Sequence, residues 1–191
     1  MKRYLILLFI FATVTNLNAQ SQKKKDRIEQ LNAQLTAFDE AKDWINARKS
    51  LKELYSLDKP NKAHYYCGFG VIAEQEGKID EAIKIYQQAI SRYKKSDCGY
   101  FNLGRIYYNK AIEIQGEADK RYYDRYDERY IAEKEKAKQY FRQALPLLEK
   151  GVEISPKLNY LIALRSIYYN LEMVDKYNEI DSFIEKERNK K

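Results

Sequence analysis

The sequence predicts an all-α fold, a solenoid of about four antiparallel helix pairs in which one pair is extended. Strong helix formers dominate most stretches of the 191-residue chain, which contains seven glycines and three prolines. Apolar and small residues recur three and four positions apart, the spacing of one face of a helix. The same pattern returns after 34 residues, which indicates stacked copies of one helix-pair unit.

The N-terminus has the layout of a secretory signal. Lys2 and Arg3 precede an apolar run over 5–12, and a polar stretch follows that ends near Ala19. A membrane-spanning helix needs about 20 apolar residues, so this run is too short. We expect a signal peptide over 1–19, with retention as an uncleaved anchor as the alternative. The cleaved protein is then exported, periplasmic or secreted, and has no stable membrane insertion.

The remaining chain suits one helical domain with a short leader. Residues 20–27 form a basic N-terminal segment, and the repeat domain covers 28–191. The formal charge is +7, but Lys and Arg alternate with Glu and Asp along the predicted helices. Interleaved charges are typical of a solvated surface, whereas nucleic-acid binding requires a dense basic face. We therefore expect no nucleic-acid partner.

The clearest unit covers residues 63–96. Gly77 stands between two helical stretches, where one helix must end and the chain reverse. Asp80 and Glu81 fall in the first turn of the second helix, where negative charge favours the helix dipole. The apolar and small positions of this unit are Tyr66, Phe69, Gly70, Ala82, Tyr86 and Ala89.

This arrangement resembles the tetratricopeptide repeat, a helix-turn-helix unit of about 34 residues. Gly104 repeats Gly70 at a spacing of 34 residues. Departures at Arg165 and Tyr177 are typical of a terminal capping unit. The resemblance implies a right-handed solenoid, with units over about 28–62, 63–96, 97–157 and 158–191. Second helices should begin near Asp43, Ile79, Tyr126 and Val174.

The third unit contains an insertion that predicts a long helical hairpin. The distance from Gly104 to Ala144 is 40 residues, against 12 between the matching positions of the preceding unit. The extra 28 residues read as helix, so each helix gains about 14 residues and the pair forms an arm of roughly 20 Å. The turn should lie near 123–127, with Asp124 or Asp127 as N-cap, and Pro146 should kink the returning helix.

The predicted tip of this hairpin is rich in tyrosine. Tyr offers a large contact area with few rotatable bonds, and it is common in interfaces. These side chains either zip the two helices together or contact a partner, and the sequence leaves both open. The tip residues are Tyr122, Tyr123, Tyr126 and Tyr130.

The chain offers little material for catalysis. Its single histidine, His64, and its cysteines, Cys67 and Cys98, form no Cys-x-x-Cys pair and no zinc ligand set. We expect no enzyme, no metal and no cofactor. The two cysteines fall on the first helices of adjacent units, so a disulfide is one alternative and free thiols are the other.

The resemblance also implies a binding surface. In such arrays the first helices line a concave face that receives a peptide or a partner helix, so we expect a protein-interaction or assembly module of the cell envelope. The alternative is a structural subunit that self-associates through the hairpin. The residues that the resemblance places on this face are Val71, Glu74, Gln75, Phe101, Arg105, Tyr108, Asn109, Tyr169 and Asn170.

Overall fold

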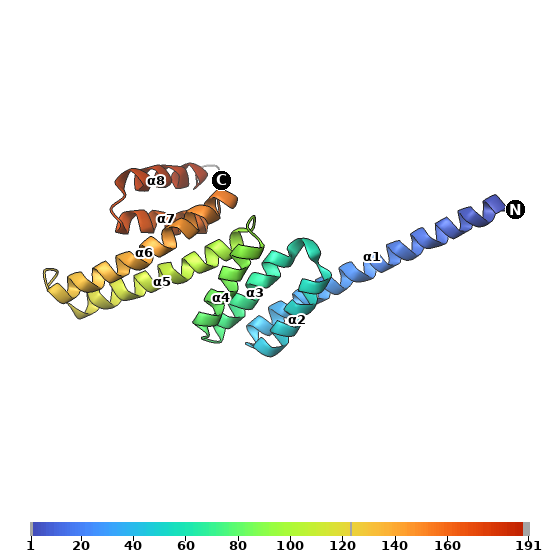
Figure 1. Cartoon of the computed structure of the whole chain (residues 1–191), viewed down its shortest axis with the longest axis horizontal. Helices are drawn as coiled ribbons and strands as arrows, with labels where there is room; N and C mark the ends of the chain where they lie inside the picture. Colours follow the sequence, from blue (N-terminus) through green and yellow to red (C-terminus); the bar gives the residue numbers. More distant parts are fainter. Residues whose placement is uncertain (1, 123, 189–191) are drawn as a thin grey trace. The chain divides into compact units, whose positions relative to one another are not determined.

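The computed structural model describes residues 2–122 and 124–188, with side chains from 18 to 186 apart from Tyr123. This part of the chain forms eight α-helices and one short 3₁₀ helix and contains no strand, which confirms the all-α prediction (Figure 1). The elements are α1 Lys2–Glu40, α2 Trp44–Leu57, η1 Lys59–Asn61, α3 Lys62–Gln75, α4 Ile79–Arg92, α5 Asp97–Arg121, α6 Glu128–Ile154, α7 Leu158–Asn170 and α8 Val174–Arg188.

The predicted helix boundaries are confirmed to within two residues. Second helices begin at Trp44, Ile79, Glu128 and Val174. Asp43 caps α2, since its carboxylate accepts a hydrogen bond from the backbone N–H of Asn46. The chain divides into two compact units, 1–77 and 78–191.

The N-terminal unit contains α1, α2, η1 and α3. Leu31 of α1 packs with Leu51 and Leu54 of α2 and with Ile72 of α3 in one buried core. A bidentate ion pair supports the α1–α2 contact, with the Arg27 guanidinium nitrogens 2.7 and 2.8 Å from the Glu53 carboxylate oxygens. Helix α1 runs through the predicted signal and basic segments, and no described helix is long and apolar enough to cross a membrane.

Three of the helix-pair turns share one backbone conformation. Lys42, Gly77 and Glu172 have φ of 54°, 75° and 59°, and each lies two residues before a second helix. A left-handed residue after a helix lets the chain reverse, and glycine adopts it without steric cost. Gly77 is therefore the unstrained choice, whereas the lysine and the glutamate adopt a conformation that disfavours a Cβ.

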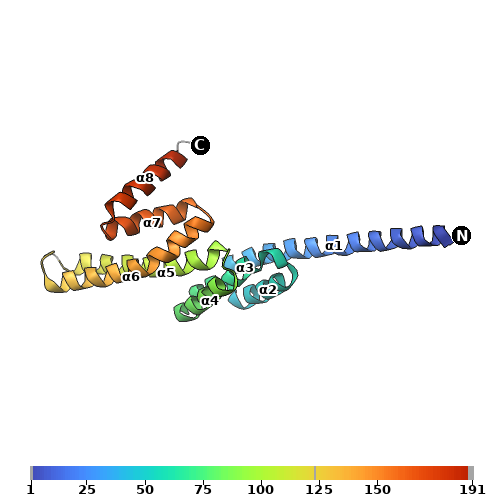
Figure 2. The ribbon, with the colours of Figure 1, turned by 45° about the horizontal axis from the view of Figure 1, so that its top comes forward.

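The C-terminal unit contains α4 to α8 and carries the long hairpin. Helices α5 and α6 have 25 and 27 residues, against 14 in α4, so the hairpin prediction is confirmed. Each is three to four turns longer than α4, slightly less than predicted, because the turn between them uses several of the inserted residues. The hairpin continues past the α7–α8 turn (Figure 2).

The hairpin turn is capped as the sequence predicts. The Asp127 carboxylate accepts a hydrogen bond from the backbone N–H of Arg129 at 2.8 Å and pairs with the Arg129 guanidinium. Hydrogen bonds from the Arg129 side chain and backbone hold the pKa of Asp127 down at about 2. Pro146 lies inside α6, and the kink predicted there stays a prediction.

Helices α5 and α6 approach each other closely at the base of the hairpin. A Cβ built on Gly104 would lie 2.8 Å from Cγ of Leu148 and 3.2 Å from Cβ of Leu147. Leu148 belongs to a buried core that also includes Phe141 and Ile167, so α5, α6 and α7 share one apolar interior. The absent side chain at Gly104 lets α5 approach α6 at this level.

Candidate functional site

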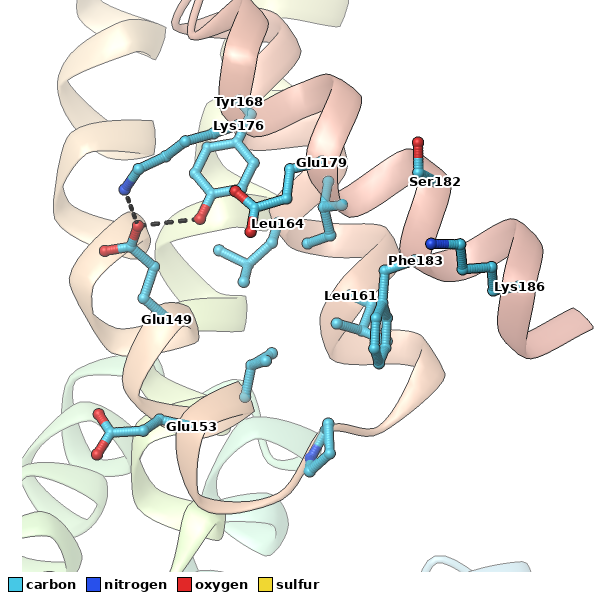
Figure 3. Close-up of a pocket in the computed structure, with 13 residues that line it drawn as sticks. Glu149, Glu153, Leu161, Leu164, Tyr168, Lys176, Glu179, Ser182, Phe183 and Lys186 are labelled. Carbon is cyan, nitrogen blue, oxygen red and sulfur yellow. Dashed lines mark hydrogen bonds and ion pairs between the residues drawn. The ribbon is translucent and has the colours of Figure 1, made fainter.

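A groove of about 660 Å³ lies between α6, α7 and α8 in the C-terminal unit (Figure 3). Leu161, Leu164 and Ile180 are buried and form its floor, because their side chains also belong to the core of this unit. Phe183 of α8 forms part of the wall and is 43% exposed. The groove therefore offers an apolar surface that the rest of the described chain leaves partly uncovered.

Charged groups of both signs line the groove. The Glu149 carboxylate accepts hydrogen bonds from the Tyr168 hydroxyl at 2.9 Å and from the Lys176 ammonium at 2.6 Å, as Figure 3 shows. Burial and this carboxylate raise the pKa of Tyr168 well above its usual range, so the phenol remains a neutral donor. Glu153 and Glu179 add negative charge, and Lys186 adds a cation.

In the three helices that form the groove, the backbone N–H and C=O groups form hydrogen bonds within each helix. A helix interior has no free N–H or C=O, so these walls cannot pair with an extended strand. An amphipathic helix satisfies its own backbone and buries an apolar face, which suits an apolar floor beside charged groups. The groove therefore offers contact through side chains, and an amphipathic helix is one ligand that suits it.

The family model of the tetratricopeptide repeat matches residues 63–96, which contain α3 and α4. The chain contains a tetratricopeptide repeat. The match covers the unit that the sequence spacing singled out. The curated proteins contain no significant match to this chain.

Several solved structures align with this chain. A provisionally named protein-binding protein from Bacteroides ovatus aligns over 78% of this chain and 71% of its own, with 17% identity and a TM-score of 0.54. MamA of strain MSR-1 aligns over 83% and 75%, with 15% identity and a TM-score of 0.49. A tetratricopeptide repeat protein from Parabacteroides merdae aligns over 86% and 68%, with 17% identity and a TM-score of 0.37. The first likeness shows a shared helical solenoid fold.

The structure uses two of the predicted concave-face residues for packing within the repeat array. The Phe101 ring stacks on Tyr160 with centroids 3.9 Å apart, and the Tyr108 hydroxyl donates to Oγ of Ser166 at 3.1 Å. Both contacts join α5 to α7. These two side chains are therefore half-buried between helices.

The other predicted concave-face residues differ in exposure. Tyr169 is 71% exposed and Asn170 is half-buried, with its amide donating to the Ser166 carbonyl. The binding role of these two residues stays a prediction. In the other positions, Val71, Gln75 and Asn109 are exposed, and Glu74 and Arg105 are half-buried.

The tyrosines of the hairpin tip divide into engaged and exposed side chains. The Tyr130 hydroxyl donates to Asp119 at 3.0 Å, and the Arg129 guanidinium lies 5.3 Å from the Tyr122 ring centre. Tyr126 is 88% exposed, and Tyr123 lies outside the described residues. Tyr122 and Tyr130 thus stabilise the tip itself, while Tyr126 presents its ring to solvent.

Both cysteines are disulfide-bonded and neither is free. Cys67 is buried in α3, and Cys98 is half-buried at the start of α5. The sequence left the disulfide open, and the chain has no further cysteine. Neither thiol is therefore available as a nucleophile in this state.

Sequence reasoning missed the groove of the last repeat. Its side chains come from three helices, and the wall residue Phe183 was not singled out. The available signal was the position of Phe183 beside Ile180 and Ile184, which widens the apolar stripe of α8 beyond what the core needs.

Proposed function

We propose that the chain is an exported protein-interaction module of the cell envelope, which holds an amphipathic helix of a partner protein in the groove between α6, α7 and α8. The observation that carries this proposal is the apolar floor of Leu161, Leu164 and Ile180 beside the half-exposed Phe183. A partner helix would bury this wall residue, and apolar burial is the main favourable term in association.

Export is supported by the N-terminal signal layout and by the oxidised state of both cysteines. Disulfides persist in oxidising compartments and are rare in the cytosol. We expect the protein from the envelope or medium fraction to begin at Gln20, as measured by intact mass and N-terminal sequencing. Full-length protein confined to the cytoplasmic fraction would contradict the export step and leave the groove proposal standing.

The groove is tested by a photo-crosslinking amino acid placed at Phe183 in intact cells. Ile131 of α6 is the matched control, because it is 48% exposed and lies outside the groove. We expect a defined partner adduct from position 183 and none from position 131. Mass spectrometry of the adduct should identify a helical segment of the partner.

Substitution of Phe183 and of Ile131 measures how much each residue contributes to the affinity for the partner. Phe183→Gln is expected to weaken binding of the identified partner by about tenfold or more, since it removes a large apolar contact at no change in charge. Ile131→Gln should leave binding unchanged, and both variants should melt near the parent temperature. Equal affinities for the two variants would overturn the groove proposal. A hydrodynamic mass that rises with concentration would favour self-association through the hairpin, provided that it falls when the 28 hairpin residues 112–139 are deleted.

A further inference from the structure

The long hairpin and the α7–α8 turn enclose a second hollow of about 700 Å³, which we call the corner. Its hairpin wall includes Gln115, Lys134 and Lys138, and its turn wall includes Tyr169 and Glu172. The three hairpin residues lie within 112–139, a stretch of 28 residues that accounts for the excess over the preceding unit. The corner therefore exists because the hairpin is long enough to pass the α7–α8 turn (Figure 1).

Glu172 of the α7–α8 turn forms an ion pair with the hairpin at the corner. Glu172 has φ of 59°, where the repeat over 63–96 has Gly77, so the chain keeps a side chain at a position that favours glycine. Its carboxylate lies 2.8 Å from Nζ of Lys138, and this pair raises the pKa of Lys138 and lowers that of Glu172. The ion pair links the α7–α8 turn to the hairpin.

The corner contains a cation that its neighbours leave unneutralised. Lys134 and Lys138 are four residues apart on α6 and both line the corner. Glu172 and Glu135 neutralise Lys138, at 2.8 and 3.5 Å. Among the described residues, the contact of the Lys134 ammonium is the ring of Tyr130 at 5.8 Å, and no ion pair is formed there.

An exposed aromatic surface accompanies this cation. Tyr169 is 71% exposed, and its ring centre lies 6.0 Å from that of Tyr177, which also lines the corner. Tyrosine rings offer apolar area at low entropic cost and recur at contact surfaces. A ligand that contacts both the Lys134 ammonium and the Tyr169 ring carries a carboxylate next to an aromatic or aliphatic side chain.

We propose that the corner binds an acidic peptide segment of a partner protein, with a carboxylate on Lys134 and a neighbouring apolar side chain on Tyr169. This is a second docking surface beside the apolar groove, with which it shares the lining residue Tyr168, and it gives the hairpin extension a role as one wall of a site. A cation and an ionised carboxylate form a charge-assisted contact, whose strength falls as salt rises.

The test uses a fluorescent synthetic peptide of alternating Glu and Leu with a central Phe, and a matched peptide with Gln in place of Glu. Anisotropy should show binding of the acidic peptide to the full mature chain, weakened by salt, and at least about tenfold weaker binding of the Gln peptide. Lys134→Glu should weaken acidic-peptide binding by about tenfold or more. Lys110→Glu is the matched control, because Lys110 lies on α5 outside the corner and the net charge changes equally.

Further variants separate the corner from the groove. Phe183→Gln should leave the acidic-peptide affinity unchanged, so loss of groove binding and loss of corner binding can be told apart. Tyr169→Ala should weaken the acidic peptide without affecting its salt dependence. Equal loss in Lys134→Glu and Lys110→Glu would overturn the proposal, as would equal binding of the Gln peptide. Lys134-dependent binding of phosphatidylglycerol vesicles in place of the peptide would overturn it in favour of a membrane surface.

Discussion

Loss of the disulfide is expected to lower the free energy of unfolding by about 3–4 kcal/mol. We infer that the two cysteines are bonded to each other, since the chain contains two and neither is free. A bond between Cys67 and Cys98 closes a loop of about 30 residues, which restricts the unfolded chain and so raises its free energy. The effect should appear as a lower denaturant midpoint when the protein is reduced.

The matched variant is the double substitution Cys67→Ala with Cys98→Ala. It should melt close to the reduced parent protein, and reductant should not change its melting further. Thiol labelling of the denatured, unreduced parent supplies an independent measurement. Two labelled thiols per chain would contradict the bond, and an intermolecular dimer on a non-reducing gel would contradict its pairing within one chain.

Gly104→Leu is expected to destabilise the protein by about 1–3 kcal/mol. A Cβ at this position would already lie 2.8 Å from Cγ of Leu148 and 3.0 Å from Cδ2, so a full leucine side chain must push α5 away from α6. Both helices contribute to the buried core of the C-terminal unit, which resists such a shift because protein interiors are closely packed. Thermal melting by circular dichroism measures the effect.

Gly116→Leu on the same helix is the control for this substitution. A Cβ at Gly116 meets nothing within 4 Å, so the added side chain has open space. Leucine favours the helix over glycine, so this variant should be unchanged or more stable by up to about 1 kcal/mol. An unchanged melting temperature for Gly104→Leu would show that this glycine does not set the helix approach.

The helix pairs and the long hairpin could be predicted because their signals are local or periodic. Gly77 and the 34-residue spacing locate the turns and second helices. Asp127 has the position and chemistry of an N-cap, and the structure confirms that role. Gly104 follows from the same spacing, since the position that matches Gly70 needs a small residue.

The binding surfaces could not be predicted in the same way. Phe101 and Tyr108 fit the face that the resemblance suggests, yet their contacts with Tyr160 and Ser166 appear once α7 packs on α5. The groove forms between three helices, and the corner forms between the hairpin and a turn. The spacing of residues within one helix gives no information about how these elements pack together. The left-handed backbone at Glu172 gives no sequence signal, because the residue type argues against it.

The contacts of the hairpin lead us to expect that a change in its length leaves the repeats beneath it undisturbed. Its base is closed by the Gly104 contact with Leu148, while its tip is held by contacts between its own residues, such as Asp119 with Tyr130. A change of one turn in each helix, about seven residues in total, preserves the faces of both helices. The length of the hairpin, and with it the extent of the corner, can therefore differ between related proteins by whole helical turns. The packing of the repeats beneath it stays the same.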